Sequence, residues 1–241
     1  MSLKIKNFRV KVEDKEVVKG VDMELKGGEV VALMGPNGSG KSSLAYALMG
    51  HPKYETEGKL LVDGRGMEDR SPDERAKAGL FLAFQYPVGI AGVSVKEVML
   101  MAMRERGIKK SALELRKELE VLAEELGVSE DLLKRSINDG FSGGEKKKME
   151  ILQMRILKPK YAILDETDSG LDIDALRVVA EGARMAVEKD SMGLLVITHY
   201  QRILKYLKPD RVVVLKKGRV VDEGGDEVVK KLEKEGYKSY D

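Results

Sequence analysis

The chain has 241 residues, enough for one large domain or two small ones around a buried core. Although 35% of the residues are charged, the formal net charge is only +2, so the surface is of mixed sign and does not favour nucleic acid as a partner. The chain has no cysteine and only two histidines, which excludes disulfides, thiolate chemistry and a histidine-rich metal site.

The N-terminus lacks the pattern of a targeting segment. MSLKIKNFRV alternates charged and apolar residues, whereas a signal peptide needs a continuous apolar stretch. No later run approaches the roughly 18 apolar residues of a membrane span. We therefore expect a cytoplasmic protein without direct membrane insertion.

The first third of the chain predicts strands. Residues 3–12 and 16–25 are alternating or apolar around a polar turn, which predicts an antiparallel hairpin, and residues 58–63 predict a third strand of the same sheet. Residues 30–34 form an unbroken apolar run, typical of a parallel strand buried on both faces.

A phosphate-binding loop follows that run. Residues 35–42 fit the motif G-x-x-x-x-G-K-[ST], and they lie between the strand at 30–34 and a helix predicted over 43–49. Glycine backbone N–H groups would surround a β-phosphate, the lysine would reach the β and γ oxygens, and the last serine would take a Mg²⁺ position. A glycine-rich turn without a ligand is the alternative, and kinase, GTPase and ATPase all remain open. The predicted ligand-binding residues are Gly35, Pro36, Asn37, Gly38, Ser39, Gly40, Lys41, Ser42 and Ser43.

The next segments predict a further ligand and a helical insert. Gln85 follows an apolar strand at 80–84, and its amide oxygen is suited to the Mg²⁺ shell. We expect Tyr86 to begin the insert. Capping boxes that start at Ser94 and Ser111 predict helices up to about residue 127.

Residues 140–149 read GFSGGEKKKM and predict a helix with an unusual start. Ser142 with Glu145 fits a capping box. Three lysines just inside a helix N-terminus are unfavourable unless an anion lies opposite. Two interpretations stay open, because the lysines either add to a positive potential or lie on a solvated face.

Two later apolar strands also end in polar side chains. Residues 161–164 precede Asp165 and Glu166, and residues 193–197 precede His199, with a helix predicted over 174–188. At the C-terminal edge of a parallel sheet, Asp165 can hold Mg²⁺ through water, while Glu166 lies on the other side of the strand.

These end residues suit nucleotide hydrolysis. A second carboxylate near the γ-phosphate can orient an attacking water, which an NTPase needs and a kinase does not, and His199 can hydrogen-bond the γ-phosphate. An acidic surface turn and an ordinary loop histidine are the alternatives. Residues 211–221 predict a hairpin, and residues 227–235 a charged surface helix.

Five motifs in order make the chain resemble the ABC-type ATPases: Walker A at 35–42, the Q-loop at Gln85, the signature at 142–145, Walker B at 163–166 and the switch histidine His199. The resemblance implies ATP and Mg²⁺ as cofactors, with Ser42, Gln85 and Asp165 (via water) at the metal and Glu166 and His199 as catalytic residues. It also implies an α/β fold with a mixed sheet core, an N-terminal antiparallel β-subdomain and a helical subdomain insert.

The same resemblance implies domain limits and a pairing. Residues 1–85 and 159–241 would form the ATP-binding core with the β-subdomain, and residues 86–158 the helical subdomain. Two subunits would pair transiently, head to tail, when nucleotide is bound. The signature of one copy would then close on the ATP of the other, through Ser142, Gly143, Gly144 and Glu145.

Within the family the chain resembles the SufC ATPases. The resemblance lies in residues 84–88, 92–94, 135–147 and 167–172, and it implies SufB/SufD-like scaffold partners in iron–sulfur cluster assembly, docked around residues 86–95. The chain departs from the expected pattern at Gly89, Ala91 and Lys148, and Val12 stands where many members stack an aromatic ring on adenine, which leaves the preference for ATP over GTP open. The alternatives are the nucleotide-binding subunit of an ABC membrane transporter and a nucleotide-operated switch that barely hydrolyses, although a switch does not need Glu166.

Overall fold

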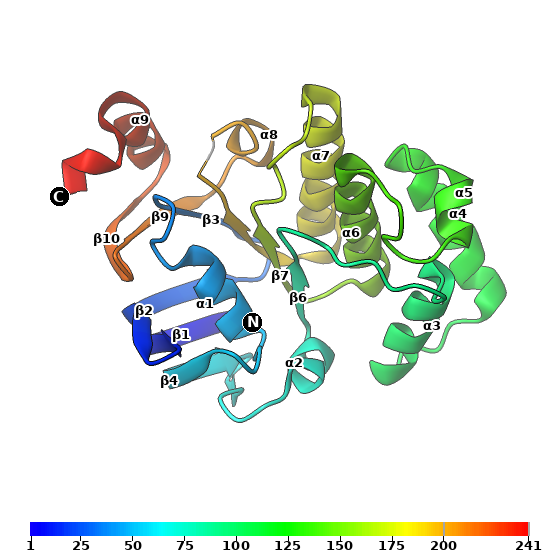
Figure 1. Ribbon diagram of the computed structural model, residues 1–241, viewed down its shortest axis with the longest axis horizontal. Helices are drawn as coiled ribbons and strands as arrows, with labels where there is room; N and C mark the ends of the chain where they lie inside the picture. Colours follow the sequence, from blue (N-terminus) through cyan, green and yellow to red (C-terminus); the bar gives the residue numbers. More distant parts are fainter. Residues whose placement is uncertain (200, 241) are drawn as a thin grey trace.

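The computed structural model describes residues 1–199 and 201–240, which are organised around two sheets (Figure 1). The first sheet is antiparallel with the strand order β2-β1-β4-β5. The β1–β2 pairing confirms the predicted hairpin, and β4 confirms the predicted third strand. The strands are β1 (Ser2–Val12), β2 (Lys15–Lys26), β4 (Glu55–Val62) and β5 (Arg65–Gly66).

The second sheet is the centre of the molecule and has the strand order β10-β9-β3-β8-β7-β6. Among the described strands of this sheet, only the edge strand β10 runs antiparallel to its neighbour. Because β3, β7 and β8 are buried at every residue, they carry the continuous apolar runs seen in the sequence. The strands are β3 (Val30–Met34), β6 (Leu80–Ala83), β7 (Tyr161–Asp165), β8 (Gly193–Ile197), β9 (Arg211–Lys216) and β10 (Arg219–Gly224).

Helices cover both faces of the central sheet (Figure 1). Successive side chains along each strand point to opposite faces of the sheet. Leu33 therefore packs with helix α1 and the antiparallel sheet, whereas its neighbour Ala32 packs with α6 and α7. Helices α1 and α6 therefore lie on opposite faces. The helices are α1 (Lys41–Leu48), α2 (Pro72–Ala78), α3 (Val95–Glu105), α4 (Ala112–Glu125), α5 (Glu130–Lys134), α6 (Gly143–Leu157), α7 (Ile173–Asp190), α8 (Leu204–Leu207), α9 (Asp226–Glu235) and the 3₁₀ helix η1 (Gly236–Tyr240).

Capping chemistry fixes several helix starts. The predicted capping boxes are present at Ser94, Ser111 and Ser142, where α3, α4 and α6 begin. The region that follows Gln85 opens with a non-helical segment, because residues 84–94 are not helical and the first helix of this region begins at Val95. Pro87 disfavours helical backbone at the residue before it, which explains the extended path.

A buried arginine anchors the helix that follows the phosphate loop. Arg75 of α2 is 3% exposed, and its guanidinium donates to the carbonyls of Ala47 (2.7 Å) and Leu48 (3.0 Å) at the end of α1. It also donates to the Glu68 carbonyl at 2.9 Å. These bonds satisfy carbonyls that a helix end leaves without partners.

Among the described residues, no helix has both the length and the apolar character needed to cross a bilayer.

Candidate nucleotide-binding site

Four parallel strands bring the predicted site residues to one edge of the central sheet. The phosphate loop follows β3, Gln85 lies two residues beyond β6, Asp165 ends β7 with Glu166 after it, and His199 follows β8. A pocket of about 260 Å³ lies at this edge. It is lined by Asn37, Gly38, Ser39, Gly40, Lys41, Ser42, Ser43, Gln85 and Glu166.

Close backbone contacts shape the phosphate loop. A Cβ atom on Gly35 would lie 2.1 Å from the carbonyl oxygen of Leu215 on β9, so only glycine fits there. Gly40 has a φ of 106°, and a Cβ on it would lie 2.7 Å from the Val17 carbonyl oxygen. The backbones of strands β9 and β2 thus lie close against the two ends of the loop. Because α1 starts at Lys41, its positive N-terminus faces the pocket.

Lys41 is the buried cation of the loop. It is 4% exposed, and its Nζ donates to the carbonyls of Gly35 (2.8 Å) and Pro36 (3.2 Å). Burial lowers the pKa of Lys41, while Glu166 and Asp165 oppose that shift. An ammonium held among carbonyls beside a helix N-terminus is suited to an anionic phosphate.

Ser42 and Asp165 form the candidate magnesium position. The Ser42 hydroxyl donates to Oδ1 of Asp165 at 3.0 Å. Asp165 is fully buried, and its Oδ2 has no hydrogen-bond partner within the described part of the chain. Burial raises the pKa of Asp165 to about 6. A hydroxyl beside an orphaned carboxylate oxygen fits Mg²⁺, which takes oxygen ligands and completes its shell with phosphate and water.

Glu166 points into the pocket through an unusual backbone conformation. Strand alternation predicted that its side chain would lie on the side opposite Asp165. Instead Glu166 follows the end of β7 with a φ of 46°, in the left-handed region, and its carboxylate lines the pocket. Non-glycine residues seldom adopt this conformation, and such strain often accompanies function. Its backbone N–H donates to the Ile197 carbonyl at 2.9 Å, which fixes the turn.

The Glu166 carboxylate contacts two other predicted site residues, Gln85 and His199. Oε2 accepts a hydrogen bond from the Gln85 side-chain amide at 2.7 Å, and Oε1 lies 3.3 Å from Nδ1 of His199. His199 is not among the described residues that line the pocket, and it lies against Glu166. Sequence reasoning placed Gln85 at the metal, and the structure adds its contact with the carboxylate that would orient water.

The signature residues lie apart from this pocket. Ser142 and Gly143 are exposed at the tip of α6, on the face of the sheet opposite α1. The Ser142 N–H donates to Glu145 Oε2 at 2.7 Å, and the Glu145 N–H donates to Ser142 Oγ at 3.3 Å, which completes the capping box. Outside its own chain neighbours and helix backbone, a Cβ on Gly143 would meet no described atom within 4 Å, so packing among the described residues does not require glycine there.

Two of the three lysines after the signature contact different parts of the chain. Lys147 is buried, and its Nζ donates to the carbonyls of Phe84 (2.5 Å) and Gln85 (2.7 Å). Lys148 donates to the Gly127 carbonyl at 3.3 Å. Neither sequence interpretation anticipated a lysine turned inward, because helical spacing alone does not show which neighbouring loop offers carbonyl groups.

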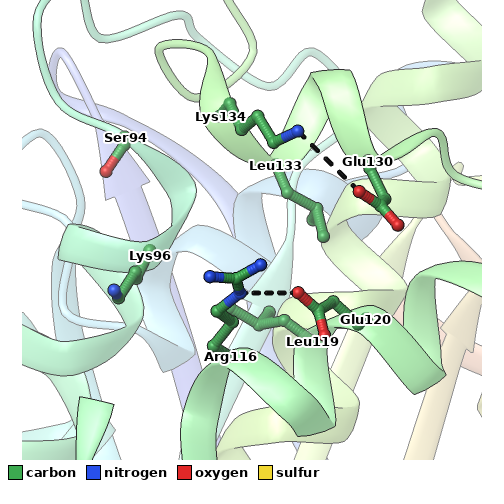
Figure 2. A pocket seen from close by; sticks show the side chains of 8 residues that line it. All are labelled: Ser94, Lys96, Arg116, Leu119, Glu120, Glu130, Leu133 and Lys134. Carbon is green, nitrogen blue, oxygen red and sulfur yellow. Dashed lines mark hydrogen bonds and ion pairs between the residues drawn. The ribbon is translucent and has the colours of Figure 1, made fainter. Parts of the chain in front are cut away.

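A second cavity, of about 340 Å³, lies between α3, α4 and α5 (Figure 2). Four of its charged side chains form two ion pairs, Arg116 with Glu120 at 2.7 Å and Lys134 with Glu130 at 3.8 Å, and Lys96 also lines it. Leu119 and Leu133 also line it. Because most of its charges pair with one another, this cavity offers fewer convergent polar groups for a nucleotide than the pocket at the phosphate loop does.

Comparison with known proteins decides between the nucleotide-using classes. The family described as ABC transporter matches residues 18–169. This chain is an ABC-family ATPase. It is 50% identical over 240 residues to the Bacillus subtilis protein named Vegetative protein 296, covering 98% of this chain and 92% of that one. It is 47% identical over 241 residues to "Probable ATP-dependent transporter ycf16" of Cyanophora paradoxa, covering 98% and 93%.

Solved structures give the same fold. A structure titled "Structure of ATP binding subunit of ABC transporter" is 26% identical, with a TM-score of 0.82 over 97% of this chain and 94% of that one. The ATP-binding cassette MJ0796, solved as a dimer bound to ADP and Pi, is 23% identical with a TM-score of 0.80 over 92% and 98%, a likeness of fold. These matches confirm the predicted fold class. As a member of this family, the ABC ATPase hydrolyses ATP with Mg²⁺, which confirms the predicted activity and cofactors.

Proposed function

We propose that this ABC ATPase couples ATP binding, dimer closure and hydrolysis to rearrangement of a SufB/SufD-like scaffold in iron–sulfur cluster assembly. The observation that carries this choice is the segment after Glu166, residues 167–172, which departs from the pattern usual in transporters. Its Asp168 is 1% exposed and accepts a hydrogen bond from the Thr198 hydroxyl at 2.9 Å. The distinctive segment therefore connects to the turn that carries His199.

Closure would complete the site with residues of a second copy. In this proposal residues 1–85 and 159–241 form the ATP-binding core, and residues 86–158 the helical subdomain. Ser142, Gly143, Gly144 and Glu145 of one copy meet the γ-phosphate held by the other. The exposed tip of α6 and the open space around Gly143 support this pairing. Packing among the described residues does not require glycine at this position, and a residue without a side chain allows close approach by another molecule.

Complementation between two inactive variants tests the pairing. Ser142→Arg blocks the signature, and Lys41→Ala disables the phosphate loop. Mixing the two should restore ATP hydrolysis, because each heterodimer keeps one intact pair of half-sites. For random pairing we expect roughly a quarter of wild-type activity from a 1:1 mixture. A signature that acts within its own chain predicts no recovery.

Ser111→Arg is the matched control for the blocked signature. Ser111 also caps a helix through a capping box, so this change removes a cap worth about 1 kcal/mol without touching α6. We expect Ser111→Arg alone to keep ATP hydrolysis near the wild-type rate. Loss of activity in this control would show that the cap, and not the partner's phosphate, explains the Ser142 result.

An apolar surface beside the Q-loop is the proposed docking face. Tyr86 and Val88 are each 79% exposed and Ile90 is 51% exposed, next to a cavity of about 570 Å³. Large exposed apolar side chains that cluster in this way mark interaction sites. Since this chain has no cysteine, the docked partner would supply the ligands of the iron–sulfur cluster.

Co-purification tests the proposed partner. The chain co-expressed with a SufB/SufD-like scaffold should purify as a complex without detergent, and Val88→Asp should weaken it at least about 10-fold, since a buried charge at an interface centre is costly. Val121→Asp, on α4 and 56% exposed, is the matched control and should bind normally. A partner that stays bound only in detergent would instead support the nucleotide-binding subunit of a membrane transporter, the alternative that the name of the ycf16 relative favours.

A further inference from the structure

A buried ion pair on α6 forms hydrogen bonds with the backbone of the loop that carries Gln85. Lys147 and Glu150 are three residues apart, so they lie on the same face of the helix, and both side chains are 5% exposed. The Lys147 ammonium donates to the carbonyls of Phe84 and Gln85, while Glu150 Oε1 accepts from the Phe84 N–H at 2.6 Å. Nζ of Lys147 lies 3.8 Å from Oε2 of Glu150.

Stability does not explain this arrangement. Taking two charges out of water is costly, and well-packed apolar residues in their place are often as stable or more so. Oε2 of Glu150 is also buried and has no hydrogen-bond partner among the described residues. What the pair gains is position, because three hydrogen bonds fix three successive peptide groups on the two sides of Phe84 and Gln85.

The contacts continue from this pair into the site. The Gln85 amide donates to Glu166 Oε2 at 2.7 Å, so α6 reaches the carboxylate through a single loop residue. In the other direction, α6 starts at the signature, and Lys147 lies about 7.5 Å along the axis from Ser142 at the usual helical rise. A helix is stiff over that length, so movement of its tip is passed to the loop.

We propose that Lys147 and Glu150 are positioning residues that couple engagement of the signature to the placement of Gln85 and, through it, of Glu166. This inference rests on the proposed function, because it requires the signature to meet a phosphate of the second copy. Beyond the proposed function, the inference states that movement of α6 reaches the Gln85 side chain through the backbone of residues 84 and 85.

A double-mutant cycle on hydrolysis tests the coupling. Lys147→Met keeps the length of the side chain and removes the ammonium. We expect kcat to fall roughly 10-fold while KM for ATP changes less than about 3-fold, since Lys147 does not line the pocket. Gln85→Ala should also lower kcat. If Lys147 acts through Gln85, the double variant should be no slower than the slower single variant.

Arg155→Met is the matched control on the same helix. Arg155 is 9% exposed and pairs with Glu125 at 3.2 Å, away from the Q-loop. Its loss should lower the melting temperature, and its effect on kcat should multiply with that of Gln85→Ala. Multiplying effects for Lys147→Met and Gln85→Ala would overturn the proposed coupling and assign Lys147 to folding alone.

A second variant and a reporter keep the test decisive if Lys147→Met folds poorly. Glu150→Gln keeps the acceptor for the Phe84 N–H and removes the charge beside Lys147, so we expect a smaller fall in kcat than for Glu150→Leu. Because the chain has no tryptophan, Tyr86→Trp gives a single tryptophan beside Gln85, whose fluorescence can be excited apart from that of the tyrosines. Its response to ATP should be lost in Glu150→Leu, and an unchanged response would contradict the coupling. If the mixture of Ser142→Arg and Lys41→Ala recovered no hydrolysis, the proposed pairing itself would fail, whatever the Lys147 and Glu150 variants do.

Discussion

Glu166→Gln is expected to bind ATP normally and to lose hydrolysis by roughly 10²- to 10⁴-fold, the usual contribution of a general base. The amide keeps the shape of the side chain and an oxygen that can accept from Gln85, which contacts Oε2 at 2.7 Å. It removes the negative charge that would polarise the attacking water and that lies 3.3 Å from Nδ1 of His199. Phosphate release under saturating ATP, together with calorimetric titration of ATP, separates the two effects.

Glu55→Gln serves as the control for this experiment. Glu55 is an exposed carboxylate on β4 that does not line the pocket, so its replacement makes the same chemical change outside the phosphate site, and turnover should be unaffected. Near-normal turnover in Glu166→Gln would move the general base to another residue. A fall in ATP affinity as large as the fall in turnover would assign Glu166 to binding.

Lys41→Ala is expected to weaken ATP binding by at least about 100-fold, since the lysine would form charge-assisted hydrogen bonds worth about 1.5 to 3 kcal/mol each with the phosphates. Lys41 is already positioned for this, buried at the base of the loop and held by the carbonyls of Gly35 and Pro36. Titration with a fluorescent ATP analogue measures the loss.

Thermal unfolding should accompany this titration, because Lys41 is buried and its removal also changes the loop. The control Lys53→Ala removes an exposed lysine close in sequence, and ATP affinity should stay at the wild-type value. Unchanged affinity in a folded Lys41→Ala protein would discredit the phosphate site at residues 35–42.

The sequence predicted the sheet edge well because the physical signals are local. Apolar runs of four or five residues, each followed by polar side chains, mark buried parallel strands. The structure brings the ends of β3, β6 and β7 to one pocket and places His199, after β8, against Glu166. Capping boxes located the starts of α3, α4 and α6 for the same reason. Helix α2 was missed although Ser71, Pro72 and Glu74 form such a signal.

Features that depend on contacts between distant segments escaped prediction. The inward turn of Lys147 depends on carbonyls some sixty residues earlier, at Phe84 and Gln85. The direction of Glu166 depends on a left-handed φ, which strand periodicity cannot reveal and which the Ile197 carbonyl helps to fix. A residue's type and spacing therefore showed where the chemistry lies, and tertiary structure decided which atoms face one another.

The left-handed backbone at Glu166 bears on how genetic screens of this position should be interpreted. With a φ of 46°, the site disfavours β-branched residues regardless of their chemistry, whereas asparagine and glycine fit it easily. In a saturation library, valine or isoleucine at codon 166 would score as inactive partly because the turn distorts. Ranking the alleles by catalytic defect alone would confuse conformational tolerance with proton transfer, so each allele needs its own measure of correct folding.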